Sequence, residues 1–306
     1  MKKFILKSSF YLLPIALLLI SHLLYFGFPP PRLSESISFN TKILNIKNNH
    51  FNKQVDVLAF GSSMSLNNIH TKTIKKIFNS SYLNISSWGQ NIEEDYNLIK
   101  IFTKIYEPQT IIISTSIMDF NDLSKNINYE LLDDYLFGTG LLVYKKLNFK
   151  YLLEASTSFY SKRSDRFSYS SLFYDDCGGV NFETVDFIID STRWSGRTLN
   201  EKDINLVQYH YLDSISKFCK GMNIELIVIQ SPYRVGYYSK LIDSSLNILS
   251  SHSNKVDSIL RKSNSIFIDS NVQNWDDSLF VDYSHLNKEG SKLYTEFFLK
   301  EKTGNK

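Results

Sequence analysis

Two short motifs, more than two hundred positions apart, hold the residue types of a serine nucleophile and its supporting groups. Residues 61–63 read Gly-Ser-Ser, and residues 282–285 read Asp-Tyr-Ser-His. A serine hydroxyl becomes a useful nucleophile when an adjacent base takes its proton and a third group orients that base. His285 is the candidate base, and Asp282 lies close enough in a tight turn to orient its imidazole. The spacing therefore predicts a catalytic triad of Ser63, His285 and Asp282 for acyl-group chemistry.

The turn that carries Ser63 also suits the stabilisation of an oxyanion. Gly61 ends a short apolar run and can adopt backbone angles that are closed to other residues. The segment from Leu66 to Phe78 is expected to be helical, so free backbone N–H groups would point at the loop. Such groups stabilise the negative charge that develops during acyl transfer.

Short apolar runs alternate with helical patterns along the chain, and this alternation predicts an α/β fold. Strands are expected at 55–60, 82–85, 110–114, 224–229 and 265–268, and helices at 66–78, 92–106, 202–220, within 241–262 and at 287–300. Each strand run is continuously apolar, which is typical of a parallel sheet covered on both faces. Sites in such sheets lie at the carboxyl ends of the strands, where Gly61, Gly89 and Ser114 follow.

The N-terminal residues have the pattern of a membrane anchor. Residues 10–28 are apolar, and lysines precede them at positions 2, 3 and 7. Nineteen residues of helix span roughly 28 Å, close to the hydrocarbon thickness of a bilayer. By the positive-inside bias, residues 1–9 would stay in the cytoplasm. The remainder would face the periplasm or cell exterior from the inner or cytoplasmic membrane. A cleaved signal peptide and a buried soluble helix are the alternatives.

The rest of the chain divides into a stalk and one domain with an insertion. Residues 29–54 begin with prolines and continue with polar sequence, which predicts a stalk leading into the domain at 55–306. Within the domain, residues 123–200 do not follow the alternation. They are rich in aromatic and hydroxyl side chains and carry four arginines, Arg163, Arg166, Arg193 and Arg197. We interpret this stretch as an insertion beside the site, either a lid or substrate-binding wall or a plain surface elaboration.

Composition and motifs exclude several functional classes. The 306 residues are 43% hydrophobic and 21% charged, with 34 basic and 31 acidic side chains and a formal net charge of +3. This balance does not indicate a nucleic-acid partner. There is no HExxH, P-loop or glycine-rich dinucleotide fingerprint, so we expect no metal or nucleotide cofactor. Cys177 and Cys219 are either a single disulfide or two isolated thiols.

With these residues in place, the chain resembles the SGNH, or GDSL-type, hydrolase superfamily over roughly residues 55–300. The first block of that family is Gly-Asp-Ser with its serine as nucleophile; Ser63 matches the serine, and Ser62 replaces the aspartate. The second block contributes a glycine N–H, matched by Gly89, and the last block is Asp-x-x-His, matched at 282–285. The resemblance implies a flavodoxin-like, three-layer fold with about five parallel strands.

The third block departs from the family pattern of Gly-x-Asn-Asp, whose asparagine donates to the oxyanion. Ser116 occupies the asparagine position, and Asn121 comes five residues later. A hydroxyl can donate one hydrogen bond, so we expect Ser116, or alternatively Asn121, to complete the oxyanion hole with Gly89. Losing one such donor can cost on the order of 100-fold in rate.

The Gly-Ser-Ser form resembles the membrane-anchored branch of the superfamily that acts on cell-envelope polymers, including proteins similar to the teichoic-acid D-alanylation protein. This resemblance implies a serine O-acyltransferase or acyl esterase that acts on a cell-envelope polysaccharide. Its partners would be an acylated envelope glycan or acyl donor and a multi-span membrane O-acyltransferase. The alternative is a non-catalytic, membrane-tethered glycan-binding or assembly partner that retains the fold. Both transfer and hydrolysis use the same triad, so the sequence leaves that choice and the acyl group open.

Overall fold

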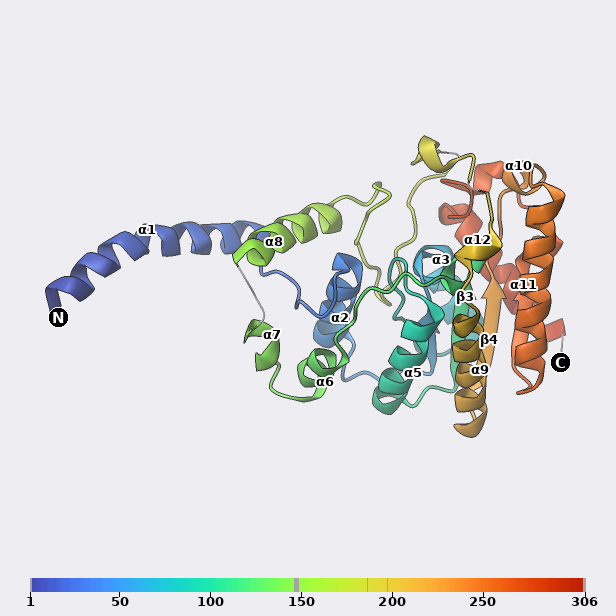
Figure 1. Ribbon diagram of the computed structural model, residues 1–306, viewed down its shortest axis with the longest axis horizontal. Coiled ribbons are helices and arrows are strands. Elements are labelled where there is room, and N and C mark those ends of the chain that lie inside the picture. The colour runs from blue at the N-terminus through green and yellow to red at the C-terminus, as the bar shows by residue number, and fades with distance from the viewer. Residues whose placement is uncertain (1, 146–148, 186, 197, 305–306) are drawn as a thin grey trace.

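A five-stranded parallel sheet forms the centre of the protein (Figure 1). The computed structural model describes residues 2–145, 149–185, 187–196 and 198–304. Its strands are β1 (Val57–Phe60), β2 (Tyr82–Asn84), β3 (Thr110–Thr115), β4 (Glu225–Gln230) and β5 (Ile266–Asp269). They lie in the order β2-β1-β3-β4-β5, and each neighbouring pair is parallel. The predicted α/β class with five parallel strands is confirmed, and this order is the flavodoxin-like one.

Alternation along the buried strands divides the core into two layers. In β3, Ile111 and Ile113 belong to one apolar cluster, and Ile112 belongs to another. Successive side chains of a strand point to opposite faces, so these clusters lie on opposite sides of the sheet. Helices cover both: α5 (Ile92–Tyr106), α9 (Leu206–Gly221) and α11 (Asp243–Arg261) pack in the first, and α4 (Thr71–Phe78) and α12 (Lys288–Gly304) in the second. The result is a three-layer arrangement.

Further short elements lie between these strands and helices along the chain. They are α10 (Val235–Tyr238) and the 3₁₀ turns η1 (Ile117–Phe120), η3 (Glu201–Asp203), η4 (Ser270–Val272) and η5 (Asp277–Leu279). The helix predicted for 202–220 therefore begins only at Leu206, where the Asn205 side chain accepts the N–H of Val207.

The helix predicted for 66–78 is wrong in its extent, because the chain forms two helices there. The first, α3 (Ser63–Asn68), begins at the candidate nucleophile itself, and α4 follows after extended backbone at Ile69 and His70. The break is held by contacts with the C-terminal part of the chain. The N–H of His70 donates to Thr295 Oγ1 at 2.8 Å, and Asn68 Nδ2 donates to the carbonyl of Ser284 at 3.2 Å.

The segment 29–54, predicted as a stalk, contributes a helix to the domain core. Helix α2 (Ile37–Asn49) is capped by Ser36, whose side chain accepts the N–H of Phe39. Phe39, Ile43 and Ile46 are fully buried in the first apolar cluster. This helix therefore packs onto the sheet domain rather than leading up to it.

In the described part of the insertion at 123–200, three helices are followed by irregular chain. They are α6 (Tyr129–Phe137), α7 (Leu141–Lys145) and α8 (Phe149–Ser164), and the turn η2 (Ser191–Arg193) comes near the end. Leu131, Leu132 and Leu136 of α6 belong to the first apolar cluster. Part of the insertion is thus core, and the chain after α8 approaches the candidate site. Arg197, one of the arginines singled out above, lies outside the described residues.

The two cysteines are separate free thiols. Both are buried, Cys219 in the first apolar cluster and Cys177 in the second, so the sheet lies between them. Of the two alternatives, the isolated thiols are the ones found.

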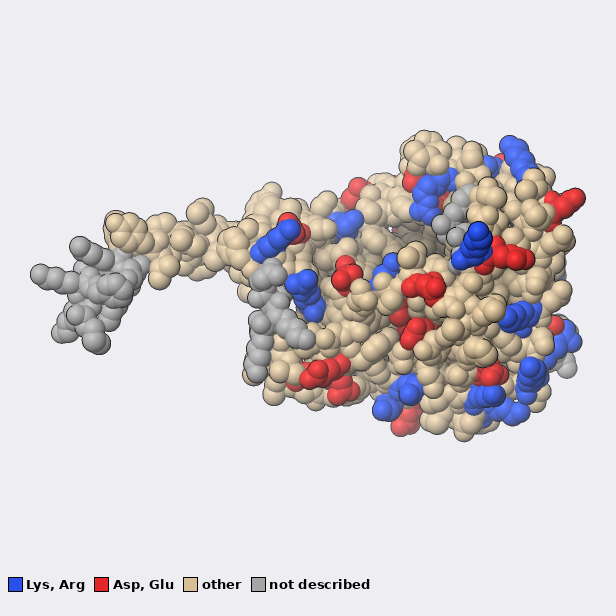
Figure 2. Space-filling view, viewed as in Figure 1, with Lys and Arg blue, Asp and Glu red and all other residues tan. Residues whose placement is uncertain are grey.

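Helix α1 (Lys2–Phe26) projects from the body (Figure 1). Its C-terminal end packs on α8, where His22 Nε2 lies 2.6 Å from Ser156 Oγ and the ring of Phe26 packs edge-on against Tyr160. Residues 10–26 of this helix include no Lys, Arg, Asp or Glu, and the part of the projecting helix that Figure 2 does not draw in grey is tan. Within the described residues, no helix has both the length and the apolar character needed to cross a bilayer. The anchor at 10–28 stays a prediction.

Candidate active site

The turn after β1 presents Ser63 at the carboxyl edge of the sheet. Gly61 has φ +122°, and a Cβ on it would lie 2.8 Å from the carbonyl oxygen of Ser114 and 2.9 Å from Ser65 Oγ. Only glycine fits this position without displacing its neighbours. The Ser62 side chain accepts the N–H of Met64 at 3.2 Å and so starts α3. Because Ser63 is the first residue of that helix, its own N–H has no intrahelical acceptor.

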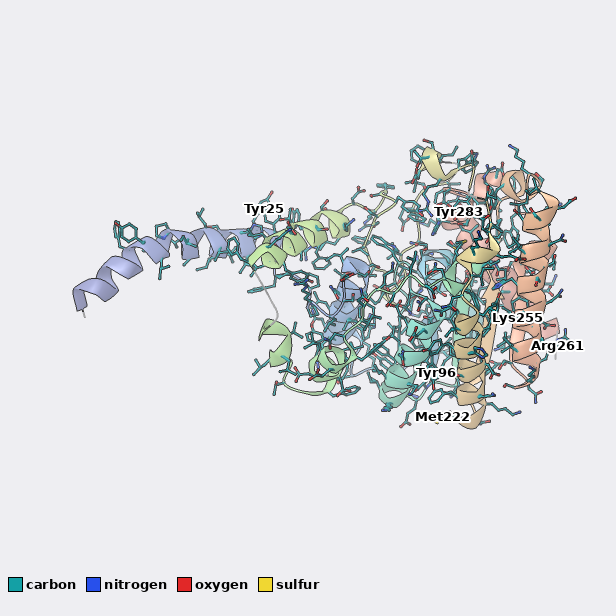
Figure 3. All side chains as sticks on the ribbon, viewed as in Figure 1. Tyr25, Tyr96, Met222, Lys255, Arg261 and Tyr283 are labelled. Carbon is teal, nitrogen blue, oxygen red and sulfur yellow. The ribbon has the colours of Figure 1, made fainter. Side chains whose placement is uncertain are left out.

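The structure brings the three predicted triad residues together. His285 Nε2 lies 2.8 Å from Ser63 Oγ, and His285 Nδ1 lies 2.9 Å from Asp282 Oδ2. The other oxygen of Asp282 accepts the N–H groups of Ser284 and His285 at 2.8 and 2.7 Å, which fixes the loop before α12. Tyr283, labelled in Figure 3, marks where this loop lies in the molecule.

Asp282 stays ionised although its side chain is fully buried. Burial opposes its charge, but the electrostatic interaction and hydrogen bond with His285, the N–H of Ser284 and the guanidinium of Arg193 outweigh that penalty and hold the pKa of Asp282 below its usual value. A buried carboxylate in this position can orient the imidazole and stabilise the imidazolium that forms when a serine proton is taken.

Two polar side chains of the insertion, Tyr169 and Arg193, interact with Asp282 and His285, and these contacts were not predicted. The hydroxyl of Tyr169 lies 3.1 Å from Asp282 Oδ2 and 3.0 Å from His285 Nδ1. Arg193 donates from Nη1 to the Tyr169 hydroxyl, and its Nε lies 3.5 Å from Asp282 Oδ2. Neither lies in a motif, and the only sequence signal was the richness of the insertion in aromatic residues and arginine.

A cavity of about 320 Å³ opens at the nucleophile. Polar and aromatic side chains line it, namely Ser63, Asn67, Trp88, Tyr169, Ser170, Arg193 and His285. Trp88 also lines a second cavity of about 410 Å³, together with Lys125 and Glu35. The insertion thus contributes Tyr169, Ser170 and Arg193 to the lining of the cavity at Ser63, and its role in substrate binding stays a prediction.

Gly89, the predicted oxyanion donor, follows Trp88 and has φ +63°. Within the described part of the chain, its N–H has no hydrogen-bond acceptor. A Cβ on this residue would lie 2.7 Å from both Cε and Nζ of Lys125, so the lysine side chain lies directly over the glycine.

Ser116 and Asn121, the two alternatives for the remaining donor, are occupied in local turns. The Ser116 side chain accepts the N–H of Met118 at 3.3 Å and caps η1. Asn121 donates from Nδ2 to the carbonyl of Met118, and its Oδ1 accepts the N–H of Leu123 at 2.6 Å. Neither is among the described residues that line the cavity at Ser63. The donor that these residues were expected to supply stays a prediction.

A buried carboxyl group lies beneath the nucleophile turn. Asp119 accepts hydrogen bonds from Thr115 Oγ1 at 3.0 Å and from the N–H of Ser116 at 2.8 Å, and it also accepts from the Ser62 side chain. Burial raises the pKa of Asp119 to about 6 against the effect of these hydrogen bonds. Ser62, the residue that departs from the Gly-Asp-Ser pattern, thus contacts a carboxyl group supplied by another segment.

Among the described residues, no three His, Cys, Asp or Glu side chains are grouped so that they could hold a metal ion.

Comparisons with other proteins give structural likenesses only. No protein-family model matches the sequence, and no curated protein matches it. A lipase/acylhydrolase from Enterococcus faecalis is similar in structure at 11% identity, with 82% of this chain and 97% of that chain covered and a TM-score of 0.44. A catalytic mutant of an acetylxylan esterase from Geobacillus stearothermophilus is similar at 10% identity, covering 82% and 95%, with a TM-score of 0.41.

A GDSL-like lipase from Bacteroides thetaiotaomicron is similar at 10% identity, with 80% of this chain and 86% of that chain covered and a TM-score of 0.40.

Proposed function

We propose that the protein is an SGNH-type serine enzyme that transfers or hydrolyses O-acyl groups. The observation that carries this proposal is the continuous hydrogen-bonded chain from Ser63 through His285 to Asp282, which opens onto a cavity at the serine. A nucleophile, a base within hydrogen-bond reach and a third group that orients the base form the geometry of covalent acyl transfer.

In this mechanism His285 Nε2 takes the hydroxyl proton as Ser63 Oγ attacks the acyl carbonyl. The negative charge that forms on the carbonyl oxygen is stabilised by the N–H groups of Ser63 and Gly89. The imidazolium then gives its proton to the departing alcohol, and the acyl group stays on the serine. Water completes hydrolysis, and a sugar hydroxyl completes transfer, with His285 acting as base again.

The substrate we propose is an acylated polysaccharide of the cell envelope, reached from a membrane-anchored position. Supporting this are the lysines and apolar residues of 1–28 and the exposure of apolar side chains along α1, such as Phe10 at 75% and Leu24 at 82%. A multi-span O-acyltransferase in the same membrane would deliver the acyl donor in the transfer reaction. Trp88, which lines both cavities, offers an aromatic surface for a sugar ring.

A second candidate, a non-catalytic glycan-binding or assembly partner, is favoured by one observation. Neither Ser116 nor Asn121 is among the described residues that line the cavity, and both side chains form hydrogen bonds within local turns. In that case the cavity would bind an acylated glycan without cleaving it.

Labelling of the full-length protein with a fluorophosphonate, together with hydrolysis of p-nitrophenyl acetate, separates the two candidates. We expect Ser63→Ala to abolish labelling and to lower ester hydrolysis by roughly 10³-fold or more. Ser158→Ala on α8 is the matched control and should leave both unchanged. Wild-type protein that neither labels nor hydrolyses would support the binding candidate, and labelling that survives Ser63→Ala would remove Ser63 as the nucleophile.

A further inference from the structure

We propose that Tyr169 and Arg193 are positioning residues that fix the direction of the hydrogen bonds within the triad, so that the insertion is part of the catalytic unit. The inference rests on the proposed function, because it assigns roles around the same serine. It adds two side chains that no sequence motif contains.

The donor and acceptor roles follow from the chemistry of the groups. A guanidinium has only donors, so Arg193 Nη1 must donate to the oxygen of Tyr169. With one lone pair of that oxygen occupied, the Tyr169 hydroxyl directs its own proton to Asp282 Oδ2, 3.1 Å away. An ionised carboxylate only accepts, so the order from arginine through tyrosine to aspartate has a single direction.

This order determines which nitrogen of His285 carries the proton. Nδ1 lies 2.9 Å from Asp282 Oδ2 and 3.0 Å from the Tyr169 oxygen, and both oxygens can accept from it. The proton is therefore held on Nδ1, and Nε2 is left to accept the proton of Ser63, whose Oγ is 2.8 Å away. Tyr169 thus supports the tautomer in which the histidine can act as base.

Aromatic packing holds the tyrosine over the imidazole. The Tyr169 ring stacks on Phe182 with centroids 5.7 Å apart, and its edge contact with the His285 ring is at 5.4 Å and 82°. The Arg193 guanidinium carbon lies 4.6 Å from the centre of the Tyr169 ring. A phenylalanine at 169 would keep these ring contacts and lose only the hydroxyl, which separates packing from hydrogen bonding.

The charge of Arg193 has a separate effect on His285, and this effect opposes that of the Asp282 charge. Its Nε lies 3.5 Å from Asp282 Oδ2, so it offsets part of the negative charge that favours a protonated imidazole. Asp282 and Tyr169 lie against His285, Arg193 lies against Asp282, and Asp119 is a further carboxyl that interacts with His285 through charge. Removing the arginine charge should make protonation of the imidazole easier.

The test measures kcat, KM and the pH profile of p-nitrophenyl acetate hydrolysis on the full-length protein. For Tyr169→Phe we expect kcat to fall about 5- to 30-fold with KM within about 2-fold of wild type, because one hydrogen bond to a charged group is lost. For Arg193→Gln we expect the acidic limb of the pH profile of kcat/KM to shift to a pH about 0.5 unit higher. Arg193→Lys restores the charge and should return the limb towards its wild-type position.

Two changes in the same insertion serve as matched controls. Arg166→Gln removes a guanidinium that lies over Phe173, and Tyr160→Phe removes a hydroxyl near α1; neither residue lines the cavity at Ser63. Both should behave as wild type. Unchanged kcat in Tyr169→Phe, or an unmoved acidic limb in Arg193→Gln, would overturn the inference while fluorophosphonate labelling of Ser63 still supported the proposed function. Absence of labelling in the wild type would overturn both.

Discussion

At the residue scale, the position of the nucleophile depends on a glycine rather than on the serine itself. Gly61 passes between the carbonyl of Ser114 on β3 and the side chain of Ser65 on α3, at a positive φ. The turn can therefore place the serine over the sheet edge only while this position lacks a side chain. The Gly-Ser-Ser run was informative because it holds both the glycine that this turn requires and the candidate nucleophile.

We expect Gly61→Ala to lower the free energy of unfolding by about 1–3 kcal/mol and to slow labelling of Ser63. Its Cβ would meet backbone and side-chain atoms below 3 Å, and its φ is unfavourable for alanine. Urea unfolding and the rate of fluorophosphonate labelling measure the two effects. Gly221→Ala is the control, because no atom lies within 4 Å of a Cβ there. Equal stability of the two variants would contradict the strain argument.

At the element scale, strands were easier to predict than the helices around them. A continuous apolar run bounded by a glycine or a polar residue is a local signal, and β1, β3 and β4 follow it closely. The division between α3 and α4 depends instead on His70 donating to Thr295 near the other end of the chain. No window of local sequence contains that contact.

Helix α2 was missed because its buried face is partly polar. Thr41 and Lys42 are buried, and their polar atoms find partners elsewhere in the domain, the Tyr174 hydroxyl for Thr41 and the carbonyl of Asn84 for Lys42. Burial also lowers the pKa of Lys42 to about 7. A segment with such composition is typical of an exposed stalk until these partners are known. The contacts of Tyr169 and Arg193 with the triad were also missed, because tertiary packing alone sets the positions of these two side chains.

The role of α2 can be tested by truncating one of its side chains. We expect Ile43→Ala to lower the free energy of unfolding by about 2–5 kcal/mol, because this residue is fully buried in the first apolar cluster. Asn48→Ala on the exposed side of the same helix should change it by less than about 0.5 kcal/mol. Chemical denaturation of both variants gives the comparison. If residues 29–54 were an independent stalk, the two variants would be equally stable.

At the scale of the whole molecule, the proposed envelope location depends on the projecting helix. We expect the full-length protein to remain with membranes after washing at high salt and alkaline pH, because the proposed anchor buries apolar side chains in lipid. A variant that lacks residues 1–28 should appear in the soluble fraction. Full-length Ser63→Ala is the control and should fractionate as wild type. Release of the wild-type protein by the alkaline wash would contradict the anchor.

The packing of α8 against α1 has a consequence for how the triad is held in place. Helix α8 contacts the end of α1 through Ser156 and Tyr160, and a few residues after α8 the chain reaches Tyr169. One short stretch of chain thus contacts both the projecting helix and, through Tyr169, the carboxylate of Asp282. A constraint on α1, such as its attachment to a membrane, would then change the alignment of Asp282 and His285. Membrane attachment and the rate of the reaction would be coupled.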